Sequence, residues 1–144
     1  MTVRKPFEQH LYDTYDNPAK AKLIELLISR GHDIKNVAEN YYADVVSEKD
    51  GTVYHSEAEV KTGWEDTWPV SWTEIRIPER KRRLLAKYKG NVSFFIFNNN
   101  LSKCWHIKGS QMTDDTIRVA TGKKIREGEM FFHIDYHDAE LITV

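Results

Sequence analysis

The stretch Val53-Tyr54-His55-Ser56-Glu57-Ala58-Glu59-Val60-Lys61 decides the fold, because it alternates between two kinds of side chain. Successive side chains of a β-strand point to opposite faces of the sheet. The even-numbered positions form one small or apolar face suited to a core, namely Tyr54, Ser56, Ala58 and Val60. The odd-numbered positions form the opposite face, namely His55, Glu57, Glu59 and Lys61. The stretch therefore predicts a strand with one core face and one charged face.

The dipeptide Asp50-Gly51 predicts a β-hairpin between Tyr41–Lys49 and Thr52–Lys61. Asp-Gly is a preferred pair for the two-residue type I′ loop, which places Lys49 opposite Thr52. In that register Asp44 lies opposite Glu57, Tyr42 lies opposite Glu59, and Asp44 can reach Glu59 along the diagonal. Opposed like charges are destabilising, so these carboxylates require a cation, and carboxylate oxygens suit Mg²⁺.

A helix with marked ends precedes the hairpin. Asn17 is a good N-cap, Pro18 suits the first helical position, and Gly31 suits the residue after the C-cap. An apolar stripe predicts that this helix packs on the rest of the domain, and it consists of Leu23, Ile24, Leu27 and Ile28. A short extended segment is expected at Asp33–Val37.

The remaining elements predict a sheet with helices on its faces. A basic amphipathic helix is expected from Pro78 to Gly90, followed by the almost entirely apolar run Val92–Phe97, which is typical of a central strand covered on both faces. Further strands are expected at Cys104–Lys108, near Ile117, and at Met130–Tyr136. The predicted fold class is α/β, with a central mixed sheet, in a single domain spanning residues 1–144.

Composition excludes several classes of protein. The chain has 144 residues, of which 40% are hydrophobic, and its net charge is −1. A single cysteine, Cys104, excludes an internal disulfide and a four-cysteine zinc site, and favours a reducing cytoplasmic location. No apolar run is long enough to span a bilayer, and Met1–His10 lacks the apolar stretch of a signal peptide, so we expect no membrane association.

Charge is unevenly distributed along the chain. The segment Arg76–Lys89 carries seven basic residues against one acid, Glu79, whereas Glu127–Val144 carries five acids and no lysine or arginine. A basic segment of this kind is typical of a surface that attracts a polyanion. A solvated helix face explains the same pattern equally well.

Asp44, followed about fifteen residues later by Glu59-Val60-Lys61 in a hairpin, resembles the motif of the PD-(D/E)xK nuclease superfamily. Three acid-x-Lys triplets occur, at Asp33, Glu59 and Glu79, and only the middle one lies on a strand that follows an acid-bearing strand. The resemblance covers residues 17–110 and implies a three-layer αβα restriction-endonuclease-like core, with residues 111–144 as a β-rich extension. Ala43 stands where the proline of the motif would be.

The resemblance implies a metal-dependent nuclease that hydrolyses DNA, an endonuclease with structure-selective or low sequence specificity. Asp44, Glu59 and the carbonyl of Val60 would hold Mg²⁺, for which Mn²⁺ could substitute, and Lys61 would orient the attacking water. Glu57 and Glu25 are candidates for an additional acid. The predicted DNA-contacting residues are Arg76, Arg80, Lys81, Arg83 and Lys87. A homodimer is expected because two sites are needed to cut both strands together.

Two other functions fit the same sequence. One is a non-catalytic nucleic-acid-binding or assembly module on the same fold, and the other is a nuclease that acts on RNA. Trp64, Trp68 and Trp72 could stack on unpaired bases, although packing within the domain is the favoured interpretation. The pattern His133-x-Asp135-x-His137 spans too much of one strand to close around a zinc ion, so we interpret it as a polar strand face.

Overall fold

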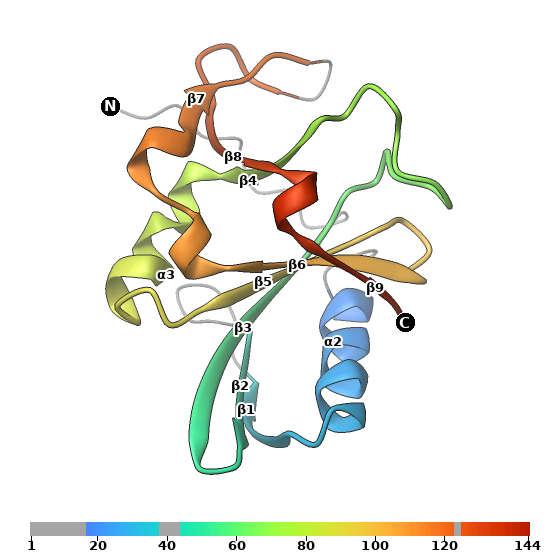
Figure 1. The fold of residues 1–144 in the computed structure, drawn as a ribbon, viewed down its shortest axis with the longest axis vertical. Helices are drawn as coiled ribbons and strands as arrows, with labels where there is room; N and C mark the ends of the chain where they lie inside the picture. Colours follow the sequence, from blue (N-terminus) through green and yellow to red (C-terminus); the bar gives the residue numbers. More distant parts are fainter. Residues whose placement is uncertain (1–16, 38–43, 123–124) are drawn as a thin grey trace.

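The computed structural model describes residues 17–37, 44–122 and 125–144, which form two sheets and two α-helices (Figure 1). A six-stranded sheet has the strand order β1-β2-β3-β5-β6-β9, and a three-stranded sheet has the order β4-β8-β7. The larger sheet is mixed, because β3 and β5 are parallel and its other neighbouring strands are antiparallel. The predicted α/β class with a central mixed sheet is confirmed.

The predicted hairpin is present with the predicted register. β2 (Val45–Lys49) and β3 (Thr52–Val60) pair antiparallel, and Lys49 lies opposite Thr52. Asp50 and Gly51 have φ angles of 52° and 80°, as a type I′ loop requires. β1 (Asp33–Val37) adds an edge strand to β2. Tyr42 and Ala43 lie outside the described residues.

The apolar run forms the centre of the larger sheet. β5 (Ser93–Phe97) lies between β3 and β6 (Lys103–Lys108), so both of its edges are paired. Its last four residues are buried, which confirms the predicted central strand. The chain's final strand, β9 (Glu140–Thr143), pairs with β6 and closes this end of the sheet.

Helix α2 (Asn17–Ser29) covers one face of the central sheet. Gly31 follows the helix with a φ of 90°, and the amide of His32 donates to the carbonyl of Leu27 (3.0 Å), as in a Schellman motif. Leu23, Leu26 and Leu27 are buried against the strands, whereas Ile28 is 57% exposed. The buried stripe therefore lies closer to Leu26 than the sequence pattern predicts.

The smaller sheet and α3 (Arg82–Lys87) lie on the opposite side of the central sheet from α2 (Figure 1). β4 (Glu74–Pro78) pairs with β8 (Met130–Asp135), and β8 also pairs with β7 (Ile117–Val119). One apolar cluster joins the two sheets, and it includes Ile75, Ile77, Phe94, Ile96, Phe132 and Ile134. The β-rich tail thus contributes β7 and β8 to this layer and β9 to the central sheet.

The basic segment is shorter as a helix than predicted. A 3₁₀ turn, Glu79–Lys81, precedes α3, which ends at Lys87 instead of continuing to Gly90. Lys89 takes a left-handed conformation, with φ 53°, and the amide of Gly90 donates to the carbonyl of Leu85 (2.8 Å). Neither α2 nor α3 combines the length and the apolar character that crossing a membrane requires.

Candidate active site

Glu57 and Glu59 lie on the face of β3 that is covered by the second layer. They pair with Phe94 and Ile96 of β5, whose side chains belong to the cluster between the two sheets. Glu57 is only 3% exposed, and the side chain of Glu59 is 16% exposed. The predicted charged face of the hairpin is therefore an interior surface, and a buried carboxylate requires partners.

Lys81 supplies the principal partner. Its ammonium is hydrogen-bonded to Glu57 Oε1 and lies 3.5 Å from Glu59 Oε1. The lysine comes from the 3₁₀ turn after β4, and its side chain is 10% exposed. Although burial acts against the charged form, Glu59 and Glu57 raise the pKa of Lys81, so it stays protonated. One buried ammonium thus bridges two carboxylates of β3.

Asp44 directly precedes β2 and is hydrogen-bonded to β3. Its amide donates to Glu57 Oε2 (3.1 Å), and its Oδ2 accepts from the amide of Ala58 (2.9 Å). Lys20 of α2 lies 3.6 Å from Asp44 Oδ1. The structure therefore brings Asp44 next to Glu57, as the predicted register implies.

The three carboxyl groups form one cluster, which we call the acid cluster: Asp44, Glu57 and Glu59. Burial raises the pKa of Asp44 above its ordinary value, although the amide of Ala58 and Lys81 oppose the shift. Burial also raises the pKa of Glu57 to about 7, against the attraction of Lys81. Crowded, desolvated carboxyl groups of this kind are frequent at functional sites.

Lys61 lies at the end of β3, and its ammonium donates to the carbonyl of Arg76 on β4. Burial lowers the pKa of this lysine, and the neighbouring Glu59 opposes the shift. The amide of Lys61 donates to the carbonyl of Phe97 (2.9 Å), which fixes its backbone to β5. Lys61 is thus near Glu59, while its hydrogen bond is to the second layer.

The acid cluster has the chemistry of a site for a hard divalent ion, since carboxylate oxygens and main-chain carbonyls are the ligands of Mg²⁺ and Mn²⁺. Asp44 and Glu59, with the carbonyl of Val60, would hold such an ion. Within residues 17–37, 44–122 and 125–144, however, no three or more His, Cys, Asp or Glu side chains are arranged to hold a metal ion. The positive charge among these oxygens comes from lysine.

Glu25, the other candidate acid, is not part of the acid cluster. It lies exposed on α2, and its Oε2 is 3.4 Å from the Nζ of Lys22 in the preceding turn. Helix α2 covers the face of β3 that carries Ala58, opposite to the face that carries Glu57. Glu25 therefore faces solvent and pairs with Lys22, and α2 reaches the acid cluster through Lys20 instead.

The predicted DNA-contacting residues do not share one surface. Lys81 points into the acid cluster, and Arg76 lies on β4, where its guanidinium donates to the carbonyl of Thr121 (3.3 Å). Arg83 donates to the carbonyl of Arg80 (3.1 Å), which shapes the turn itself. Lys87 is exposed, and its ammonium lies 5.9 Å from the ring centre of Tyr88. The turn divides these residues between the interior and the surface.

Sequence reasoning missed two lysines as partners of the acid cluster. Lys20 belongs to the helix signalled by Asn17 and Gly31, and Lys81 was assigned to a DNA-contacting surface. The third acid-x-Lys triplet, Glu79-Arg80-Lys81, marks the turn that carries Lys81. The charge imbalance on the hairpin was the one available signal, because three carboxylates on one face require cations from elsewhere.

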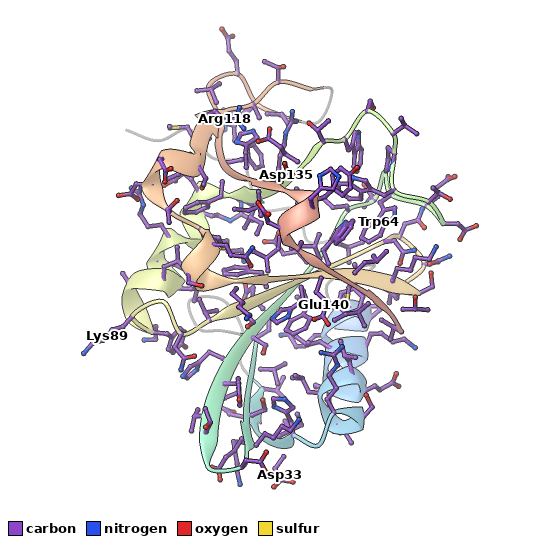
Figure 2. The ribbon with its side chains drawn as sticks, in the orientation of Figure 1. Asp33, Trp64, Lys89, Arg118, Asp135 and Glu140 are labelled. Atoms are coloured by element: carbon purple, nitrogen blue, oxygen red, sulfur yellow. The ribbon has the colours of Figure 1, made fainter. Side chains whose placement is uncertain are left out.

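The two other polar and aromatic patterns have structural roles. Trp64 (Figure 2) is 1% exposed and packs against Trp68 and Trp105. The indole of Trp68 donates to the carbonyl of Trp72 (2.6 Å). His133 is buried, whereas Asp135 accepts from the amide of His137 (2.9 Å) beyond the end of β8. The tryptophans therefore pack a loop onto the core, and the histidines do not converge.

Comparison with known proteins supports the fold assignment. No protein-family model matches the sequence, and no curated protein sequence is detectably similar. Among solved structures, the chain is similar to Hjc of Archaeoglobus fulgidus, a Holliday junction resolvase from an archaeal hyperthermophile. The TM-score is 0.56 at 12% sequence identity, and the match covers 88% of this chain and 90% of that chain. The chain therefore shares the fold of this resolvase, in agreement with the predicted restriction-endonuclease-like core.

Proposed function

We propose that the protein is a metal-dependent nuclease that hydrolyses phosphodiester bonds in DNA. One observation carries the proposal: Asp44, directly before β2, and Glu59 of β3 lie in a single buried cluster of carboxyl groups. The restriction-endonuclease-like fold supports it, and so does the likeness to a Holliday junction resolvase.

The residues of the site have distinct roles in this proposal. Asp44, Glu59 and the carbonyl of Val60 would hold Mg²⁺ or Mn²⁺, which when bound lowers the pKa of water and offsets charge on the phosphoryl oxygens. Lys61 would stand beside Glu59 as a second positive charge. Hydrolysis joins the water oxygen to phosphorus and breaks the bond from phosphorus to one sugar oxygen. That sugar oxygen takes a proton, and the other product is a phosphate monoester.

The surface around the site would contact the DNA backbone. Lys87 and the exposed Arg82 lie on α3, in the layer that also carries Lys81. Arginine and lysine bind phosphate oxygens without reading sequence, so we expect selectivity for the shape of the DNA. Two copies of the chain would be needed to cut both strands together.

A second function is favoured by a specific observation. Lys81 already occupies the space between Glu57 and Glu59, and the described residues present no set of three side chains arranged for a metal. A non-catalytic DNA-binding or assembly module on the same fold would need no more than this. In that case the ion pairs would serve only to offset the free-energy cost of burying the charged face of β3.

Cleavage and thermal stability distinguish the two functions. Wild type and Glu59→Ala are each incubated with supercoiled plasmid and with a four-way DNA junction, in Mg²⁺, in Mn²⁺ and in EDTA. The nuclease proposal expects wild type to cut at least one substrate only with a divalent ion, and Glu59→Ala to lose at least 100-fold of that rate, roughly 3 kcal/mol in activation free energy. A divalent ion should also raise the melting temperature of wild type alone.

Two results would contradict the nuclease proposal. One is that no substrate is cut under any condition while the DNA is bound, which is the behaviour of a binding module. The other is that Glu59→Ala cuts as fast as wild type, which would assign the cleavage to a contaminant or to another site. Parallel reactions on RNA of the same shape would separate a ribonuclease from a deoxyribonuclease.

A further inference from the structure

Lys81 holds an unusual place in the acid cluster because it does not belong to the strands that carry the acids. Its backbone lies in the 3₁₀ turn after β4, in the second layer. Its side chain extends from that layer to the carboxyl groups on β3. The ammonium contacts Glu57 and lies 3.5 Å from Glu59 Oε1. It is therefore a cation delivered to the carboxylates by a separate element.

The two other lysines near the cluster are placed differently. Lys20 is 3.6 Å from the outer acid, Asp44, and the ammonium of Lys61 is hydrogen-bonded to the carbonyl of Arg76. Lys61 is close enough to Glu59 for their charges to interact, whereas Lys81 contacts both Glu57 and Glu59. Lys81 is thus the lysine whose position coincides with the space between the two carboxylates of β3.

A divalent ion held by Asp44 and Glu59 would lie close to this ammonium, which contacts Glu59 and whose charge also acts on Asp44. Mg²⁺ binds carboxylate oxygen at about 2.1 Å, and Mn²⁺ prefers similar oxygen ligands. An ion bound to Glu59 would then lie within a few ångströms of the Lys81 ammonium, with little water between them to screen the repulsion. The lysine side chain is long and has free rotations, so it can move while the strands that carry the acids stay in place.

We propose that Lys81 is the resident counter-ion of the acid cluster, and that a divalent cation binds between Asp44 and Glu59 only by displacing its ammonium. This inference rests on the metal site of the proposed function and adds a control on it. Lys81 offsets the charge of the carboxylates when no metal is bound, and it lowers the apparent affinity of the site for metal.

The test measures Mn²⁺ affinity by isothermal titration calorimetry at one pH and ionic strength. Lys81→Met removes the counter-ion and keeps an apolar stem of similar length. Lys61→Met is the matched control, because it removes a half-buried lysine near Glu59 whose ammonium is hydrogen-bonded to the carbonyl of Arg76. Lys22→Met removes a half-buried lysine of α2 that pairs with Glu25.

We expect Lys81→Met to bind Mn²⁺ at least tenfold more tightly than wild type. Lys61→Met should gain less than threefold, and Lys22→Met should match wild type. An unchanged or weaker affinity in Lys81→Met overturns the inference. An equal gain in Lys61→Met also overturns it, because the effect would then be the loss of any nearby positive charge.

A second measurement uses the wild-type protein, in case Lys81→Met does not fold without metal. Lysine side chains are labelled with ¹³C at Cε, and the signals of Lys81 and Lys22 are assigned with Lys81→Arg and Lys22→Arg. Saturating Mg²⁺ should shift the Lys81 signal and leave the Lys22 signal in place. A Lys81 signal that does not move at saturation overturns the inference.

The outcomes separate this inference from the proposed function. Wild type that cuts DNA with Mn²⁺, combined with an unchanged affinity in Lys81→Met, sustains the nuclease and removes the counter-ion role. Tighter Mn²⁺ binding in Lys81→Met, combined with no cleavage by any variant, sustains the counter-ion role and removes the nuclease.

Discussion

The two faces of β3 differ in chemistry: one packs small and apolar side chains, and the other carries buried charged groups. On one face Ser56 and Ala58 are buried, and Ala58 packs with α2 and Phe97 in an apolar cluster. On the other face Glu57 and Glu59 are held by a lysine from another layer. Burial of apolar surface stabilises the fold, whereas burial of charge costs free energy unless partners are supplied. The first face therefore maintains the sheet, and the second is the candidate site.

The largest expected effect on stability comes from breaking the apolar face. Phe97 is fully buried on β5, so Phe97→Ala should lower the free energy of unfolding by about 3–5 kcal/mol. Val70 is fully exposed, and Val70→Ala should change it by less than about 0.5 kcal/mol. Urea denaturation measures both. If the faces are independent, any cleavage per folded molecule of Phe97→Ala should equal that of wild type.

The charged face should have a smaller effect on the free energy of unfolding, and this effect should depend on pH. Glu57 has an ordinary pKa of 4.5 and a pKa of about 7 in the fold, so the native state binds its proton more tightly than the unfolded chain. The associated stability is fully present below pH 4.5 and is lost as pH rises through about 7. Glu57→Gln cannot titrate, so it should lack this component.

The measurement compares wild type and Glu57→Gln by urea denaturation in EDTA at steps from pH 5 to pH 8. The stability of wild type relative to Glu57→Gln should fall by on the order of 2 kcal/mol across that range. A difference between the two proteins that stays constant with pH would show that burial does not shift the proton equilibrium of Glu57.

The smallest effect on the free energy of unfolding is expected at the residues that follow helices α2 and α3. Helix α2 ends with Gly31 at φ 90°, whereas the corresponding residue after α3 is Lys89 at φ 53°. Lys89 projects away from the body of the molecule (Figure 2). Lys89→Gly should therefore raise the free energy of unfolding by about 0.5–1 kcal/mol, because a left-handed conformation is strained for a residue with a Cβ.

The matched substitution, Gly31→Ala, should lower the free energy of unfolding by a similar or larger amount. Thermal denaturation of both variants beside wild type checks the pair. Equal signs for the two substitutions would mean that the backbone conformation after these helices is not what decides their stability.

Local signals predicted the hairpin, its register and the limits of α2. Asp50-Gly51 determines its own loop, and Gly31 ends its own helix, because both effects act within a few residues. The placement of Asp44 beside Glu57 followed from that register. The central strand could also be predicted from the sequence, since Val92–Phe97 is apolar on both of its faces.

Contacts between segments that are distant in the sequence could not be predicted from local signals. β4 was not predicted as a strand, because it is paired with β8, which lies more than fifty residues later in the chain. The contact from Lys81 to Glu57 joins the second layer to the central sheet and exists only once β4 is in place. The direction of Lys81, inward instead of outward, depends on this packing and on the turn that replaces the first part of the expected helix.

The lysine among the acids also bears on how the protein matures. In a small metalloprotein whose ligands repel one another until the metal arrives, binding and folding are a single event, and chelators unfold the chain. Here an ammonium carried by the chain itself balances the carboxylates, so folding does not have to wait for an ion. If the proposed nuclease is correct, the newly made protein would fold into an inactive, metal-free form, and removing the metal would return it to that form without unfolding it.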